Sequence, residues 1–267
     1  QKFFKEGWMA LRQRDFALDN GNHPLYRLAF VVVCLLALLV MPLLSFQYGM
    51  TWDEPVLVEY ARDIYAYYSS GGEDKAVFDM SRHARNATMH YSASFDLLAE
   101  VLHRTISPFD IYQTRHFLNA LLGALTIIFV GLLGKMAGSW RTGLLAALFV
   151  WLSPRFFGHS MNNPKDIPFM FGFAASLYFM IRLLKQLPRV FPGTLFWLAG
   201  SMAYIISIKI GGLIVVPFLG LFMGIGWLLE IRSDGFATAF KRIPRYALYL
   251  VGVAVASYFA GIYFWPW

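Results

Sequence analysis

The segment Leu28–Phe46 holds 19 residues without one charged side chain. A helix needs about 20 such residues to cross the hydrocarbon core of a bilayer. Only helices and closed barrels satisfy every backbone polar group in lipid, and continuous apolar runs are not typical of barrel strands. We therefore expect an all-α membrane protein with about seven transmembrane helices: Leu28–Phe46, Phe117–Leu133, Gly143–Phe157, Ile167–Ile181, Thr194–Ile208, Ile210–Leu229 and Tyr246–Tyr263.

The composition agrees with a membrane protein and argues against several other classes. Of 267 residues, 58% are hydrophobic and 15% are charged, which is too apolar for a soluble domain of this length. Cys34 is the only cysteine, so the chain can form neither an internal disulfide nor a cysteine-based metal site. The net charge of +7 follows from basic loops, so we expect membrane lipids as partners and no nucleic acid.

The distribution of charge predicts the orientation. With a cytoplasmic N-terminus and seven crossings, every short inner connection is basic, and most acidic residues lie outside. This is the pattern of the positive-inside rule. It requires that Tyr91–Ile106, which contains several charged residues, lies at the interface as an amphipathic helix rather than crossing.

Two segments outside the predicted spans are long: the N-terminal arm and the first outer loop. Residues 1–27 form a basic amphipathic arm, either a helix on an anionic leaflet or a loosely ordered tail. Residues 28–267 form the transmembrane module, with a large first outer loop over residues 47–114. Pro55 is typical of the first turn of a helix, and Ser69-Ser-Gly-Gly72 is expected to end that helix. We expect this helix and Tyr91–Ile106 to lie flat on the bilayer.

The outer loop opens with Trp52-Asp53-Glu54-Pro55, in which two carboxylates are adjacent at a membrane–water boundary. One reading is that an acid before Pro55 stabilises the N-terminus of the helix. The other is a catalytic role for Asp53 and Glu54, because a second acidic turn follows on the same side of the membrane.

That second turn is His159-Ser-Met-Asn-Asn-Pro-Lys-Asp166, between two short apolar segments. Asp166 could cap the following helix, but polar groups at membrane depth need partners and often mark a site. Asp166, His159 and Asn163 could also bind a divalent metal through oxygen and nitrogen ligands. We therefore add Asp166 to the catalytic candidates and keep the metal as an open alternative.

Lys209 lies between two apolar segments, in Ile208-Lys-Ile-Gly-Gly212. It either extends its ammonium to the interface or binds an anion, with Gly211 and Gly212 permitting close approach. Other cations on the outer side could serve the same anion, and the candidates for binding a phosphate are Lys209, Arg115, Arg155 and Lys165.

These motifs resemble the GT-C class of polytopic glycosyltransferases. The resemblance is to the protein O-mannosyltransferase-like family and the bacterial aminoarabinose transferases, in glycosyltransferase family 39. It is carried by Trp52-Asp53-Glu54-Pro55, by Arg115-His-Phe-Leu-Asn119 opening the second span, by Leu152-Ser-Pro154 before the turn with Asp166, and by the run from Gly200 through Lys209 to Pro217.

The resemblance implies a membrane enzyme that moves a sugar from a polyprenyl-phosphate-linked donor to a hydroxyl acceptor at the outer face. In such enzymes the aspartate matching Asp53 is the general base, the one matching Asp166 shapes the site, and basic residues hold the lipid phosphate. A Lys-Pro-Pro-Leu-Tyr-like segment of the aminoarabinose transferases is replaced here by His90-Tyr-Ser-Ala-Ser94, so we take His90 and Tyr91 as candidate phosphate ligands. The implied location is a bacterial inner membrane, or the endoplasmic reticulum membrane of a eukaryote.

Two rival functions remain open at this point. A non-catalytic membrane subunit would keep the fold within a larger complex with other protein subunits. A transporter would show paired charges at the midplane and an inverted repeat, and the segments show neither.

Overall fold

The computed structural model describes residues 21–79, 81 and 93–266. Within these ranges every regular element is a helix, which confirms the predicted all-α class. Five helical segments are long and apolar enough to cross a membrane: α2 (Pro24–Ser45), α6 (Ile111–Ala137), α9 (Asp166–Gln186), η3 (Ile210–Ile214) continued by α11 (Val215–Asp234), and α13 (Ile243–Ile262). Two shorter apolar helices are α7 (Trp140–Trp151) and α10 (Pro192–Ile206). Most of the predicted arm 1–27 lies outside the described residues.

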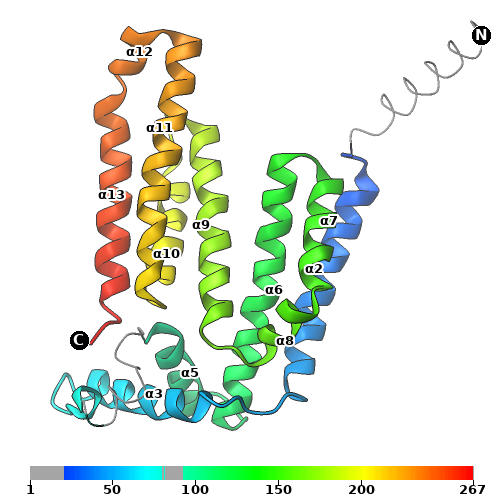
Figure 1. Ribbon diagram of the computed structural model, residues 1–267, viewed down its shortest axis with the longest axis vertical. Helices are drawn as coiled ribbons and strands as arrows, with labels where there is room; N and C mark the ends of the chain where they lie inside the picture. Colours follow the sequence, from blue (N-terminus) through cyan, green and yellow to red (C-terminus); the bar gives the residue numbers. More distant parts are fainter. Residues whose placement is uncertain (1–20, 80, 82–92, 267) are drawn as a thin grey trace, which may run out of the picture.

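The long and short apolar helices together form two packed groups that meet at α6 and α9 (Figure 1). In one group α2, α6 and α7 surround a core that includes Met41 and Ile127. In the other, α9, α10, α11 and α13 surround a core that includes Met202 and Leu219. The short helix α12 (Phe236–Phe240) joins α11 to α13 at one end of the molecule.

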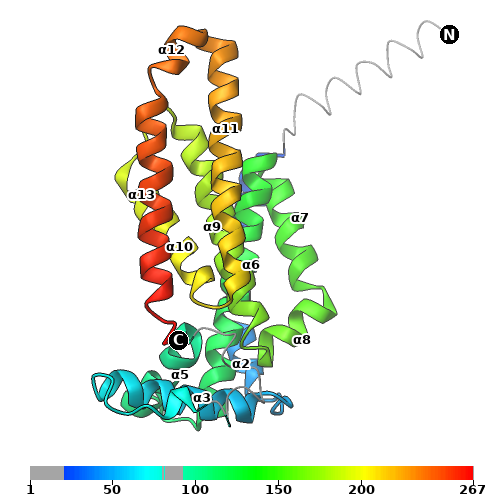
Figure 2. The ribbon, with the colours of Figure 1, turned by 60° about the vertical axis from the view of Figure 1, so that its left-hand side comes forward.

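The predicted third span, Gly143–Phe157, is wrong in its extent because the chain breaks inside it. Helix α7 ends at Trp151, and α8 (Pro154–Asn162) begins in a different direction (Figure 2). Proline has no N–H to continue a helix and fits the first helical position. The Ser153 hydroxyl accepts from the Phe156 N–H at 3.5 Å, so Ser153 and Pro154 start a new helix.

Helices α6 and α7 approach closely at two glycines. A Cβ atom on Gly143 would lie 2.6 Å from the carbonyl oxygen of Gly131, so close that the two backbones would have to move apart. Small residues of this kind let backbones pack closely within a membrane, where no hydrophobic force brings helices together. This contact fixes α7 beside α6 although α7 is short.

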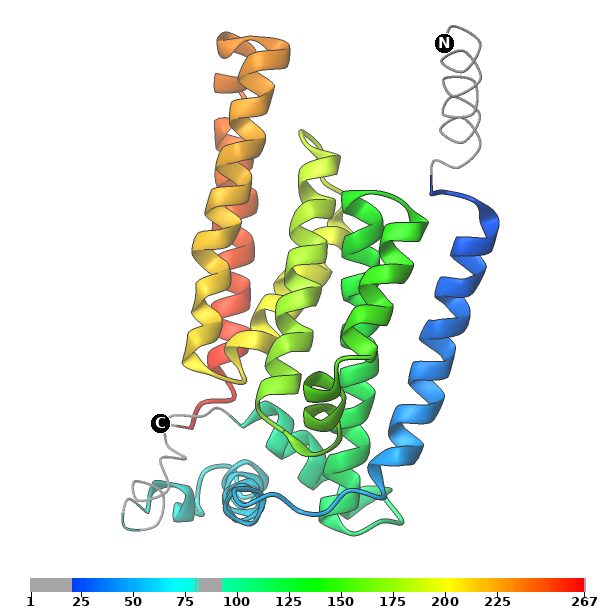
Figure 3. The ribbon, with the colours of Figure 1, turned by 45° about the vertical axis from the view of Figure 1, so that its right-hand side comes forward.

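The outer-loop helices lie across one end of the bundle, which we call the loop end (Figure 3). They are α3 (Glu54–Ser69) and α5 (Ser94–Thr105), with the 3-10 turn η1 (Ala76–Phe78) between them. Both predicted amphipathic helices are thus confirmed. Their shared core includes Tyr60, Ile64 and Val77.

The residues that follow α13 hold α3 and α5 in place. The backbone N–H of Ala93, just before α5, donates to the carbonyl oxygen of Phe264 at 3.2 Å. The Tyr68 hydroxyl, near the end of α3, donates to the carbonyl oxygen of Tyr263. The Trp265 indole N–H donates to the carbonyl oxygen of Ile206 at the end of α10, at 3.1 Å.

Candidate functional site

The two predicted acidic turns both lie at the loop end. The first precedes α3, and the second joins α8 to α9. The Nζ atom of Lys165, in the second turn, lies 4.0 Å from Oδ2 of Asp53 in the first. Carboxylates more than a hundred residues apart in the sequence therefore share one region of the molecule.

Asp53 presents its carboxylate to the surroundings, with 57% of its side chain exposed. It occupies the position before α3, yet its side chain makes no capping hydrogen bond to that helix, all of which is described. It accepts instead from the Thr51 hydroxyl at 3.2 Å. The Asp53 side chain therefore does not cap α3.

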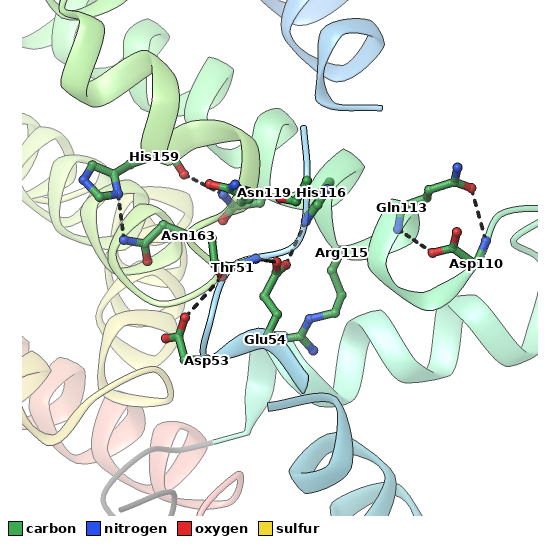
Figure 4. Close-up of polar contacts among 12 residues, drawn as sticks. Thr51, Asp53, Glu54, Asp110, Gln113, Arg115, His116, Asn119, His159 and Asn163 are labelled. Atoms are coloured by element: carbon green, nitrogen blue, oxygen red, sulfur yellow. Dashed lines mark hydrogen bonds and ion pairs between the residues drawn. The ribbon is translucent and has the colours of Figure 1, made fainter. Parts of the chain in front are cut away.

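Glu54 has the opposite environment and is fully buried. One of its oxygens accepts from the Thr51 backbone N–H at 2.7 Å, and the other lies 2.8 Å from Nε2 of His116 on α6. Figure 4 shows Glu54 directed toward Thr51 and His116, with Asp53 below Thr51 in this view. Glu54 thus anchors the turn that presents Asp53.

A further contact holds the turn against α8. The Asn162 side-chain amide donates to the carbonyl oxygen of Gly49 at 3.0 Å. The Asn119 amide on α6 donates to the carbonyl oxygens of His159 and Ser160, each at 3.0 Å. Both acidic turns are therefore fixed to the same two helices, α6 and α8.

Asp166 begins α9 and accepts from two side chains. The Lys209 ammonium donates to its Oδ1 at 2.5 Å, and the Asn163 amide donates to its Oδ2 at 3.0 Å. The Asn163 amide nitrogen also lies 3.0 Å from Nδ1 of His159. His159, Asn163, Asp166 and Lys209 thus form a continuous polar chain.

Lys209 is both paired and packed. Its ammonium lies 5.9 Å from the centre of the Phe169 ring, in addition to its ion pair with Asp166. Only 28% of its side chain is exposed. The ion pair with Asp166 explains how a lysine is accommodated between two apolar segments.

Lys165 is largely buried beside several charged groups. Burial lowers the pKa of its ammonium below the usual lysine value, although the carboxylates of Asp53 and Asp96 act to raise it. A lysine with this environment can hold an anion or lose its proton more readily than a surface lysine. It is the side chain that links the two turns electrostatically.

Arg115 is completely buried at the start of α6. Its Nη2 donates to Oδ1 of Asp96 on α5 at 2.5 Å, and its guanidinium carbon lies 5.6 Å from the Phe95 ring. Within the described residues its Nε and Nη1 have no hydrogen-bond partner. Burial raises the pKa of the Asp96 carboxyl, and the Arg115 charge opposes that rise. This pair joins α5 to the bundle beneath the surface.

Arg155 lies beside an open cavity of about 330 Å³ at the loop end. The cavity is also lined by Ser153, His159 and Asp166, so it combines a guanidinium, an imidazole and a carboxylate. Side chains of this kind can bind a phosphate-bearing group next to an acid.

The candidate metal ligands His159, Asn163 and Asp166 lie together, but the Asn163 oxygen is already used. It accepts from the backbone N–H groups of Lys165 at 3.3 Å and Asp166 at 3.0 Å. In the part of the chain that the structure describes, no three His, Cys, Asp or Glu side chains converge. The metal site stays a prediction. The candidates His90 and Tyr91 lie outside the described residues.

Sequence reasoning missed His116, Asn119 and Asp96 as members of the site. His116 and Asn119 are polar residues three apart near the end of a membrane span, which is the signal that could have identified them. Asp96 is an acid near the start of an amphipathic helix, and no sequence pattern distinguishes it from a surface residue.

Comparisons with known proteins agree with this architecture. The family model described as dolichyl-phosphate-mannose-protein mannosyltransferase matches residues 89–265, about two thirds of the chain. The matched region includes Arg115, Asp166 and Lys209, whereas Asp53 and Glu54 precede it. No curated protein and no solved structure matches the chain. The chain therefore belongs to the dolichyl-phosphate-mannose-protein mannosyltransferase family of membrane glycosyltransferases.

Proposed function

We propose that the protein transfers a sugar from a polyprenyl-phosphate-linked donor to a hydroxyl acceptor at the outer face of the membrane, with Asp53 as the general base. The loop end would then be the periplasmic or lumenal side. The observation that carries the proposal is the contrast between adjacent carboxylates: Glu54 is buried and paired, whereas Asp53 is exposed on a turn fixed from beneath.

The reaction follows from these positions. The acceptor hydroxyl oxygen attacks the anomeric carbon of the donor sugar, and the bond from that carbon to the phosphate oxygen breaks. The phosphate leaves with the bonding electrons, and Asp53 accepts the hydroxyl proton. General-base catalysis of this kind contributes roughly 10²–10⁴-fold to the rate.

The leaving phosphate needs compensation for its negative charge. Arg155, Lys165 and Lys209 are the cations that the structure supports best, because each lies at the loop end beside Asp53 or Asp166. Arg115 is completely buried, so its positive charge would act on the phosphate from a distance rather than by direct contact. The family description makes mannose the first donor sugar to test and a protein the first acceptor. Because the proposed reaction uses an acceptor hydroxyl, serine and threonine side chains are the ones to offer.

The test uses the full chain in lipid nanodiscs with polyprenyl-phosphate mannose and a serine- and threonine-containing peptide. We expect Asp53→Asn to reduce transfer by roughly 10²–10⁴-fold while expression and folding stay intact. The matched control is Glu73→Gln, an exposed carboxylate in the same loop, which should transfer sugar at the normal rate. An Asp53→Asn variant with normal transfer would refute the proposed base. Wild-type protein without transfer would favour the non-catalytic subunit.

A further inference from the structure

The orientation of the Asn163 side chain determines which nitrogen of His159 carries a proton. Oδ1 of Asn163 accepts from the backbone N–H groups of Lys165 at 3.3 Å and Asp166 at 3.0 Å. The amide nitrogen therefore faces the other way, toward Oδ2 of Asp166 at 3.0 Å and Nδ1 of His159 at 3.0 Å (Figure 4). Because an amide nitrogen only donates hydrogen bonds, Nδ1 of His159 is the acceptor in this contact.

The other ring nitrogen of His159 is consequently a donor. A neutral imidazole has one acceptor nitrogen and one N–H group, so the proton of His159 is on Nε2. Among the described residues Nε2 has no hydrogen-bond partner. His159 lines the cavity of about 330 Å³ that also contains Arg155 and Asp166. Its ring therefore offers a fixed N–H donor to a molecule bound there.

Asp166 supplies an acceptor in the same cavity. Its oxygens already accept from Lys209 and Asn163, but a carboxylate has about four acceptor positions. With 64% of its side chain exposed, the remaining positions are accessible. Apolar side chains, among them Phe156, complete the wall. A few placed polar groups on an apolar wall are typical of a small-molecule site.

A hydroxyl fits between His159 and Asp166 better than a phosphate oxygen does. A hydroxyl can accept from an N–H group and donate its own proton at the same time, so it can join Nε2 of His159 to the Asp166 carboxylate. A phosphate oxygen only accepts, and its negative charge would be repelled by that carboxylate. Arg155, in the same wall, suits the phosphate next to the sugar.

We propose that His159 is a specificity-determining residue, whose Nε2–H group donates to a hydroxyl of the sugar on the lipid-linked donor, while Asn163 holds the ring in the required tautomer. This inference rests on the proposed function and deepens it, because it assigns the transferred sugar to the cavity beside Asp166. A metal bound to Nε2 would require the proton on Nδ1, against the Asn163 amide, so the metal site and this inference are alternatives.

Two amide variants of His159 separate the donor role from a structural one. His159→Gln places an amide N–H near the position of Nε2 but lacks the acceptor for Asn163. His159→Asn keeps an acceptor near the position of Nδ1 but has no N–H group near that of Nε2. The donor role requires His159→Gln to bind the sugar-bearing lipid more tightly than His159→Asn does, and a purely structural role requires the reverse.

The experiment measures the binding of polyprenyl-phosphate mannose and of polyprenyl phosphate to the full chain in lipid nanodiscs. His159→Asn should weaken the binding of the mannose-bearing lipid by about 2–12-fold, the effect of one hydrogen bond, and leave the binding of polyprenyl phosphate unchanged. His159→Gln should bind both lipids like the wild type. The matched control is His103→Asn on α5, a histidine whose Nδ1 contacts the carbonyl oxygen of Phe109, and it should also bind both lipids like the wild type.

A measurement on the wild type keeps the inference falsifiable if a His159 variant folds poorly. Among donor analogues that each lack one mannose hydroxyl, one should bind the wild type about 2–12-fold more weakly than the complete donor. In His159→Asn the same analogue should show no further loss. Equal binding of all the analogues by the wild type would contradict the inference.

Three further results would overturn this inference alone. They are tighter binding of the mannose-bearing lipid by His159→Asn than by His159→Gln, equal weakening of both lipids in His159→Asn, and loss of wild-type binding on addition of EDTA, which would indicate a metal in place of the N–H donor. Binding involves no sugar transfer, so these results do not depend on whether Asp53 is the base. A wild-type protein that binds neither lipid would instead refute the proposed function.

Discussion

Oε1 of Glu54 lies 2.8 Å from Nε2 of His116, which joins the first turn of α3 to α6 at the residue that follows the exposed Asp53. Both side chains are buried. Through Thr51, whose N–H donates to Glu54 and whose hydroxyl donates to Asp53, this contact positions the proposed base.

His116→Ala is expected to destabilise the protein by about 1.5–3 kcal/mol, because it removes a hydrogen bond to a buried carboxylate. Thermal unfolding in detergent measures the loss, and sugar transfer should fall with it. His116→Gln retains an N–H donor and should recover part of both. If His116→Ala matched the wild type in stability and transfer, Glu54 would not depend on this contact.

Arg115→Met should cost about 3–5 kcal/mol, because it leaves Asp96 buried without its partner. The double variant Asp96→Leu with Arg115→Met should recover most of that stability, since two apolar side chains pack where the ion pair was. The KM for donor then separates two roles for Arg115. A raised KM in the stable double variant indicates electrostatic support of the phosphate, and an unchanged KM indicates a purely structural pair.

Lys165 predicts a specific pH dependence of donor binding. Burial lowers the pKa of its ammonium. As the pH rises, the ammonium therefore loses its charge before the usual lysine pKa of about 10.4 is reached. The KM of the wild type for the donor should therefore increase at alkaline pH values that are still below that pKa. Lys165→Arg keeps its charge and should move the increase to higher pH. Identical KM profiles for the two proteins between about pH 6 and 10 would exclude Lys165 from donor binding.

Gly143→Ala should destabilise the bundle by about 1–3 kcal/mol, because its Cβ atom would lie 2.6 Å from the Gly131 carbonyl oxygen and the backbones would have to separate. Gly224→Ala is the control, since a Cβ atom on that glycine meets nothing within 4 Å. Thermal unfolding of both variants in one detergent compares them. Equal stability would mean that α6 and α7 separate without cost.

The membrane spans could be predicted from the sequence because lipid permits few alternatives. An uncharged run such as Leu28–Phe46 can only cross, and it corresponds to α2. The break at Ser153-Pro154 was harder to predict, because apolar residues continue on both sides of it and only capping geometry separates α7 from α8.

The candidate site was predicted in outline but not in its pairings. The shared position of Asp53 and Asp166 follows from counting crossings, which places both turns on one side. That Glu54 turns inward while Asp53 stays exposed depends on His116, far along the sequence, and neighbouring residue types give no sign of it. The same holds for the enclosure of Arg115 by Asp96.

The contacts of Tyr263, Phe264 and Trp265 determine the order in which the loop end can be completed. Tyr68 and Ala93 bond to residues that follow them by more than 170 positions, and such distant contacts form only after the intervening chain is in place. During synthesis, α3 and α5 therefore cannot form these hydrogen bonds until the last described span has been made. The protein gains a finished loop end only once its membrane insertion has reached α13.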